Sequence, residues 1–160
     1  MKAEGKTHFE RKSDRETVAT RTFNAPARLV FEAWRNADLF KQWWMPKSMG
    51  ATIVSCTLDM RTGGSYRLEM KHPSAPNTMA FFGKYLEVIS GSRIVWTNEE
   101  SGDQGAVTTV TLVEKDGQTL LSMSELYPSK EACDEAWEGM GEGMGETFDQ
   151  LDAFLATQKR

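Results

Sequence analysis

The sequence has few of the residues from which metal sites, catalytic triads and disulfide frameworks are built. Its 160 residues include two histidines and two cysteines. His8 lies in a polar start and His72 precedes Pro73 in an expected loop, so neither has a nucleophile or an orienting carboxylate at a recognisable spacing. Cys56 and Cys133 are far apart and show no metal-ligand spacing. We therefore expect no metal ion, no cofactor and no recognisable catalytic residue.

Long apolar runs and clustered positive charge are missing as well. No apolar stretch approaches the roughly 20 residues of a membrane-spanning helix, and the first residues are charged where a signal peptide is apolar. The net charge is −4 and the basic residues are scattered, whereas phosphate binding depends on clustered Lys and Arg. We expect no membrane span and no nucleic-acid partner. The sparse cysteines favour a cytoplasmic location.

Alternation of apolar and polar residues predicts most of the chain to be β-sheet. The stretch ETVATRTF predicts a first strand from residue 16, and the polar residues 1–15 before it are expected to form a tail. Short turns such as Asp116-Gly117 separate the later strands, so neighbouring strands should pair antiparallel. Six further strands are expected, at residues 51–60, 64–71, 78–89, 92–99, 106–115 and 118–127.

Helical spacing of apolar residues appears in three places. Two short helices are expected between the first and second strands, one after Asn24 and Pro26 and one after Asn36. Ser129 can cap a last, long, amphipathic helix that ends near residue 157. The only partner large enough for this helix is the concave face of the sheet. The expectation is a single α+β domain over residues 16–158, with a six- or seven-stranded curved antiparallel sheet around the C-terminal helix.

The last helix contains four glycines in the stretch EGMGEGMGETF, at 139, 141, 143 and 145. Each glycine costs about 1 kcal/mol relative to alanine in a helix interior. Gly141 falls on the apolar stripe, between Trp137 and Met144. One interpretation is close packing of the helix backbone on the sheet, and the other is a gap that belongs to a ligand pocket. The residues themselves leave both open.

Several stretches, in this order, resemble the family of activator of heat-shock-protein-90 ATPase homologue-like proteins in the START/birch-pollen-allergen (SRPBCC) superfamily. They are RTFNAPARLVFEAW (21–34), QWWMPKSMG (42–50), DMRTGGSYRLEM (59–70), FFGKYLEV (81–88) and SRIVWTNEE (92–100). The resemblance implies a helix-grip fold, in which a curved sheet wraps around a long helix with an apolar cavity between them. The eponymous co-chaperone has a further N-terminal domain. Only about 15 residues precede the first expected strand, so we expect no such domain here.

The leading hypothesis is non-enzymatic binding of a small hydrophobic or aromatic molecule in that cavity. The resemblance favours a pocket but does not by itself select this function. The helical stripe and the apolar strand positions supply the candidate lining. Of the adjacent Trp43 and Trp44, one is expected to pack inward, and the other either lines the pocket mouth or has a purely structural role as well. The candidate binding residues are Trp44, Leu68, Met70, Phe82, Trp96, Met123, Trp137, Met140, Gly141, Met144 and Phe148. Strand alternation alone does not say which face of each strand is concave.

Two other functions stay open at this point. One is a stress-related role as the partner of a chaperone, through the outside of the sheet or the acidic face of the helix. The other is a cavity enzyme, which needs an ionisable side chain inside the pocket. In each case we expect a monomer or a weak dimer.

Overall fold

The computed structural model describes residues 7–45, 47–99 and 105–158, without the side chains of residues 49 and 139–142. In this part of the chain, eight strands form one antiparallel sheet in the order β1-β2-β8-β7-β6-β5-β4-β3. The elements in chain order are β1 (His8–Arg11), β2 (Glu16–Phe23), α1 (Ala27–Arg35), α2 (Ala37–Trp43), the 3-10 turn η1 (Lys47–Met49), β3 (Thr52–Leu58), β4 (Ser65–Lys71), β5 (Met79–Ile89), β6 (Arg93–Thr97), β7 (Val107–Lys115), β8 (Gln118–Leu126) and α3 (Lys130–Gln158).

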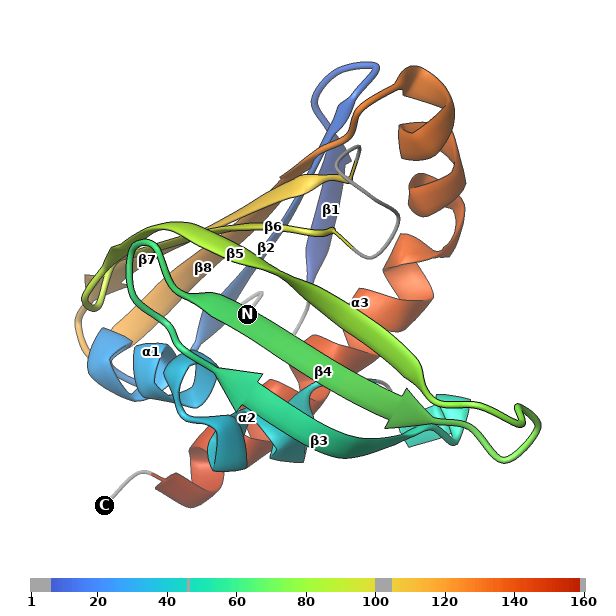
Figure 1. The fold of residues 1–160 in the computed structure, drawn as a ribbon. Helices are drawn as coiled ribbons and strands as arrows, with labels where there is room; N and C mark the ends of the chain where they lie inside the picture. Colours follow the sequence, from blue (N-terminus) through green and yellow to red (C-terminus); the bar gives the residue numbers. More distant parts are fainter. Residues whose placement is uncertain (1–6, 46, 100–104, 159–160) are drawn as a thin grey trace.

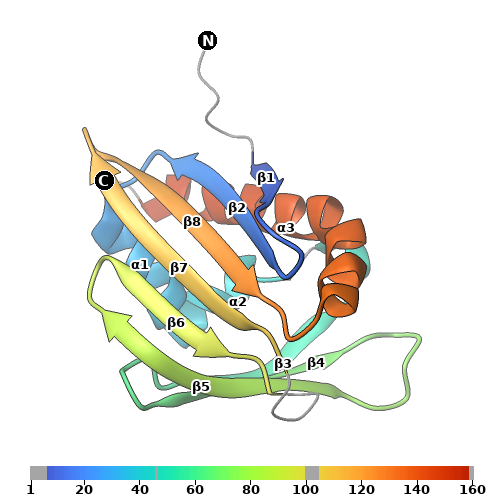
Figure 2. The ribbon, with the colours of Figure 1, turned by 90° about the horizontal axis from the view of Figure 1, so that it is seen from above.

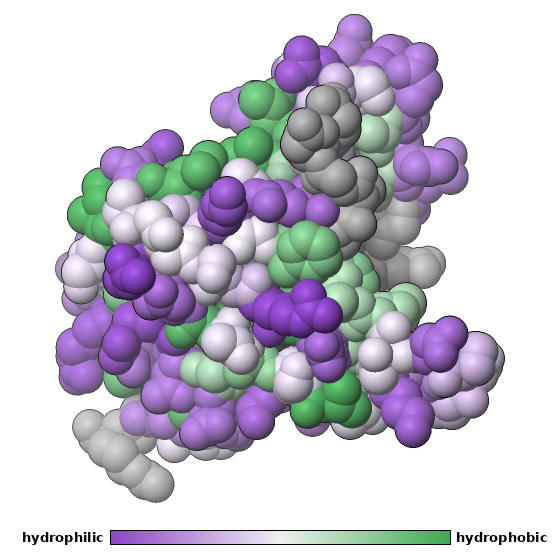
Figure 3. Space-filling view, in the orientation of Figure 1, coloured by the Kyte–Doolittle hydropathy of each residue, from purple (hydrophilic) through white to green (hydrophobic). Residues whose placement is uncertain are grey.

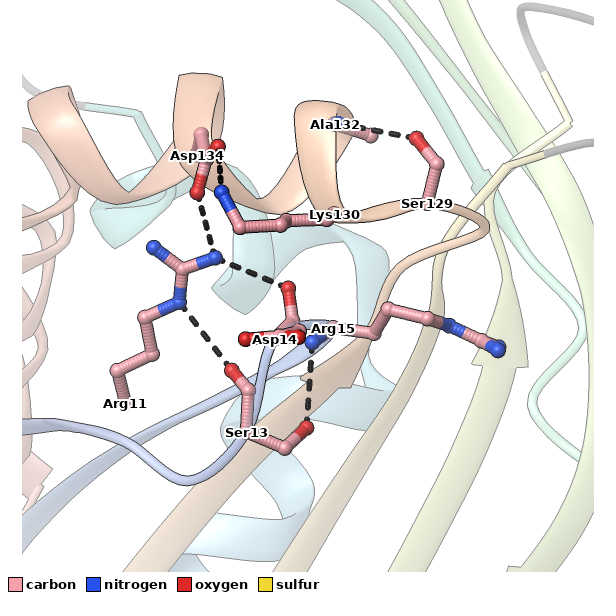
Figure 4. Close-up of polar contacts among 8 residues, drawn as sticks. All are labelled: Arg11, Ser13, Asp14, Arg15, Ser129, Lys130, Ala132 and Asp134. Atoms are coloured by element: carbon pink, nitrogen blue, oxygen red, sulfur yellow. Dashed lines mark hydrogen bonds and ion pairs between the residues drawn. The ribbon is translucent and has the colours of Figure 1, made fainter.

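The expected α+β fold and the six strands between residues 51 and 127 are confirmed. The Asn36 side chain accepts hydrogen bonds from the N–H groups of Asp38 and Leu39, and so caps α2. Ser129 caps α3 by accepting from the Ala132 N–H at 3.1 Å (Figure 4). Asn24 caps nothing, because α1 begins after Pro26 without a side-chain cap.

Residues 8–11, which the sequence analysis assigned to a polar tail, form the edge strand β1. This strand pairs antiparallel with β2, and Phe9 lies opposite Ala19 and packs against the core. Its end is tied to the start of α3, because Arg11 forms a 2.6 Å ion pair with Asp134 (Figure 4). Four residues are too short for a periodic signal, so only the pairing with β2 defines this strand.

The helices all lie on one side of the curved sheet. Figures 1 and 2 show α3 crossing the concave face, with α1 and α2 near the C-terminal end of α3. Alternate residues of β2 are buried against these helices, from Thr17 to Phe23. Phe148 of α3 is fully buried and meets Phe23 edge-to-face, with ring centroids 5.9 Å apart. The C-terminal half of α3 therefore fills the concavity over β2 and β8.

The outer face of the sheet mixes charged and apolar side chains. Arg67 pairs with Glu69 at 3.0 Å. Exposed apolar residues include Leu86 and Val113. Figure 3 shows polar side chains between most of the apolar ones on the face seen in Figure 1. None of the described helices is long and apolar enough to cross a membrane.

Helix α3 changes direction between its first turns and the rest (Figure 1), and the glycine run lies there. A Cβ atom built on Gly143 or Gly145 would meet nothing within 4 Å. These two glycines therefore border open space. Neither is needed to let the helix backbone pack closely against another element. Glycine clusters are a common cause of helix bends. The surroundings of Gly141 lie outside the described residues.

Replacing Gly143 or Gly145 with alanine is expected to raise the free energy of unfolding by about 0.5–1 kcal/mol each, because alanine loses less backbone entropy in a helix and has room for its methyl group. Urea unfolding measures the change. Gly83→Ala is the control and should destabilise the protein, since its Cβ would collide with the Thr97 carbonyl oxygen. A loss of stability at both helical positions would show that the bend itself is required.

Candidate ligand-binding cavity

A cavity of about 200 Å³ lies between the two short helices and the β3–β6 half of the sheet. Its lining is aromatic and aliphatic except for one asparagine, and no described lining residue is charged at neutral pH. The lining residues are Trp34, Phe40, Trp44, Met45, Leu58, Met60, Tyr66, Leu68, Met70, Phe81, Tyr85, Ile94, Trp96 and Asn98. The protein thus leaves apolar space next to its core, where packing is otherwise dense.

The helical wall is a cluster of aromatic rings around Trp34 of α1. The ring of Trp34 lies 5.7 Å from that of Trp44 and 5.6 Å from that of Trp96, which comes from strand β6. Phe40 of α2 stacks on Trp44 with centroids 5.0 Å apart. Such pairs contribute about 0.5–1.5 kcal/mol each beyond their area. They stabilise the wall in this arrangement.

The strand wall follows from the register of the sheet. Residues directly opposite each other in antiparallel strands share a face. Leu68 pairs with Phe81, and Tyr85 pairs with Trp96, so side chains from three neighbouring strands meet on the concave face. Ile94 lies two residues from Trp96 on the same strand and is fully buried there.

The chain after α2 closes one end of the cavity under strain. Met45 has a positive φ of 79°, which is rare for a side chain other than glycine or asparagine. Gln150 of α3 holds this segment, because its Nε2 donates to the carbonyl oxygens of Trp43 and Met45 at 2.9 and 2.8 Å. Its Oε1 accepts from the Lys47 N–H. Helix α3 therefore shapes the cavity through this loop.

Two polar groups of the lining are satisfied within the protein. The Tyr66 hydroxyl donates to the Thr97 carbonyl oxygen at 2.6 Å. The Asn98 amide donates to the Ala106 carbonyl oxygen and to Thr108 Oγ1. Neither group needs a ligand for its hydrogen bonds.

Two other polar groups are not satisfied. The Trp34 Nε1–H is buried without a hydrogen-bond partner among the described residues, and aromatic rings surround it. The hydroxyl of Tyr85, a residue only 5% exposed, donates to none of the described residues, but unlike the Trp34 N–H it keeps some accessible surface. Burial, with a smaller effect of Cys56 and Asp59, raises the pKa of Tyr85 well above its ordinary value, so the phenol stays protonated.

The nearby thiol of Cys56 is not activated. Burial raises the pKa of the Cys56 thiol to about 11. Since the thiolate is the nucleophilic form, this cysteine is a poor nucleophile at neutral pH. Among the described residues, no group of three or more His, Cys, Asp or Glu side chains could hold a metal ion.

Four of the candidate binding residues lie on the wall of the cavity: Trp44, Leu68, Met70 and Trp96. Trp43, the neighbour of Trp44, is fully buried and is not part of the described lining. Sequence reasoning missed the other lining residues. For Tyr66 a signal existed, since it lies two residues from Leu68 on the same strand face.

Five candidates lie outside the described lining. Phe82 points to the opposite face of β5, where the Arg67 guanidinium lies over its ring. Met123 and Phe148 are buried in the core under α3, and Met144 packs against that core. Trp137 is half-buried in the first part of α3. The expected helical wall is absent from the described lining because α3 fills its own half of the concavity.

The remaining two candidates, Met140 and Gly141, belong to α3. Their surroundings lie outside the described residues, so the structure does not place them relative to the cavity.

A family model described as "Activator of Hsp90 ATPase homolog 1-like protein" matches residues 24–156. The chain belongs to this family. The expectation from the sequence motifs is therefore confirmed. Within the family model's range lie α1, α2 and all of the strands that line the cavity.

Several solved structures share the fold of this chain. A protein from Rhodobacter sphaeroides has a TM-score of 0.86 at 21% identity, covering 96% of this chain and 99% of the other. A protein from Nitrosomonas europaea has a TM-score of 0.82 at 24% identity, with 92% and 97% covered. An AHSA1-like protein from Aeromonas hydrophila has a TM-score of 0.66 at 14% identity, with 88% and 93% covered. No curated protein matches the chain.

Proposed function

We propose that this protein binds a small apolar molecule of one or two rings in the cavity between α1, α2 and strands β3 to β6. The observation that carries the proposal is an apolar cavity of about 200 Å³ that the described side chains leave unfilled. An apolar cavity of about 150 Å³ is enough to hold benzene. The volume therefore suits a substituted single ring or a compact two-ring compound.

Burial of apolar surface would supply the affinity, at about 25 cal/mol per Å² before the costs of association. The aromatic contacts around Trp34 already order the helical wall, so binding immobilises few further side chains. Among the residues that the sequence analysis proposed, Trp44, Leu68, Met70 and Trp96 would contact the ligand directly.

The lining favours binding over acid–base chemistry. Of the described lining residues, only Tyr66 and Tyr85 titrate, and burial keeps Tyr85 neutral at ordinary pH. A chaperone partner is suggested by the family description alone, and pull-down of a chaperone by a variant with a blocked cavity would test it. A cytoplasmic location is compatible with the two free cysteines, Cys56 and Cys133.

The test uses the hydrocarbon indane and the ketone 1-indanone as probes. Each is expected to raise the melting temperature in a concentration-dependent way, because a ligand that binds only the folded state stabilises it by RT ln(1 + [L]/Kd). Native mass spectrometry of the purified protein would show whether a compound is already bound. Titration of the tryptophan fluorescence should report binding, because Trp34, Trp44 and Trp96 line the cavity.

Leu68→Trp blocks the cavity and is expected to remove the rise in melting temperature. The matched control is Leu86→Trp. Leu86 lies on the same sheet but is 51% exposed and is not part of the described cavity lining, so the same large side chain can be placed there without filling the cavity. If neither probe binds the unaltered protein, or if both variants lose binding alike, the proposed function is wrong.

A further inference from the structure

One polar group on the wall of the cavity is left without a partner where a ligand can meet it. Tyr85 lies on the lining and is only 5% exposed as a residue, and its hydroxyl donates to none of the described residues. The hydroxyl oxygen is not one of the fully buried atoms without a partner, so it keeps some accessible surface. A hydroxyl that keeps accessible surface and is engaged by no protein group is free to donate a hydrogen bond to a ligand.

The other polar groups of the lining differ from Tyr85. The neighbouring Tyr66, whose ring lies 5.6 Å from that of Tyr85, donates its hydroxyl proton to the Thr97 carbonyl oxygen. Both donor contacts of Asn98 go to the protein. The Trp34 N–H has no partner among the described residues, but it is fully buried, so a ligand in the cavity does not reach it in this arrangement. The Tyr85 hydroxyl remains as the polar contact for a ligand.

We propose that the ligand carries an uncharged oxygen acceptor, such as a ketone, quinone or lactone carbonyl, which accepts a hydrogen bond from the Tyr85 hydroxyl. This inference rests on the proposed function and names the chemical class of its ligand. A protonated phenol is a donor, and a carbonyl oxygen is an acceptor with two lone pairs.

The charge of the ligand follows from the rest of the lining. The described lining contains no Lys, Arg or His to compensate a carboxylate or a phosphate. An isolated anion in such surroundings is costly to desolvate. The acceptor is therefore neutral, and the remainder of the ligand is apolar.

The experiment compares 1-indanone with indane, which has the same rings without the carbonyl. The Kd of each is measured by calorimetry for the unaltered protein, Tyr85→Phe and Tyr66→Phe. Tyr85→Phe removes only the unpartnered hydroxyl and is expected to lower the ratio of ketone affinity to hydrocarbon affinity about five-fold. The affinity for indane itself should change less than about two-fold, because the apolar contacts remain.

Tyr66→Phe is the matched control, because it makes the same change on the same wall at a hydroxyl that is already engaged. It should leave the ratio unchanged. An unchanged ratio in Tyr85→Phe, or an equal fall in both variants, overturns the inference while the proposed function stands. Binding of indane-1-carboxylate as tightly as the ketone overturns the assignment of a neutral ligand. If neither neutral probe binds the unaltered protein, the proposed function fails and the inference fails with it.

Discussion

Replacing Trp43 with alanine is expected to lower the free energy of unfolding by about 4 kcal/mol. Trp43 is fully buried, and its Nε1–H donates to the Ala33 carbonyl oxygen at 3.1 Å. Its ring meets the ring of Trp34 edge-to-face at 4.9 Å. The substitution removes a large apolar surface, a buried hydrogen bond and an aromatic contact at once, and the surrounding helices cannot collapse fully into the space. Urea unfolding followed by circular dichroism measures the loss.

The adjacent residue supplies the control for this prediction. Trp44 is half-buried and lines the cavity on one side. Trp44→Ala should cost less than half as much stability, because less surface is buried, but it should weaken binding of indane and 1-indanone. If the two variants lose equal stability, the assignment of Trp43 to the core and of Trp44 to the cavity wall is wrong.

Changing both Asp149 and Asp152 to asparagine is expected to lower the free energy of unfolding by about 3 kcal/mol. The two aspartates on α3 pair with Arg21 of β2 at 2.6 and 3.2 Å, and the Arg21 side chain is only 2% exposed. The substitutions leave acceptor oxygens in place but take away both compensating charges. A guanidinium buried without a counter-charge is strongly unfavourable. Chemical unfolding at low ionic strength measures the effect.

Removing the arginine instead of the aspartates should lower the free energy of unfolding by less. Arg21→Met removes the buried charge and leaves two carboxylates, which are 66% and 39% exposed and can be solvated by water. In the Arg21→Met background, the double asparagine change should have almost no further effect, and this double-mutant cycle isolates the ion pairs. Additive losses would mean that Asp149 and Asp152 stabilise the helix without involving Arg21.

Most of the secondary structure was predictable because it depends on local chemistry. The strands between residues 51 and 127 are seven or more residues long in most cases, and four of the five connections between them contain glycine. Asp116 and Gly117 adopt the positive φ angles that the Asp-Gly turn requires. Strand β1 was not predicted, because four residues are too few for a periodic pattern. This strand is stabilised by its pairing with β2, which the local sequence does not show.

The candidate site was predictable only in part. Leu68 and Met70 share a face by their two-residue spacing, and the sequence could show that they lie together. Whether a ring such as Phe82 or its neighbour Phe81 turns inward depends on the register of β5 against β4. How the side chains fill the concave face also depends on residues far apart in the chain. This filling determines which half of the sheet has a cavity.

By itself, the sequence determined the order of the elements, the α+β class and the family, because periodicity, turn chemistry and motif order are properties of neighbouring residues. Only the tertiary structure decided that α3 fills one half of the concave face and that the cavity lies under α1 and α2. The same holds for the unpartnered hydroxyl of Tyr85. Hydrogen bonding and unfilled volume depend on residues far apart in the chain, and they exist only once the sheet has closed around its helices.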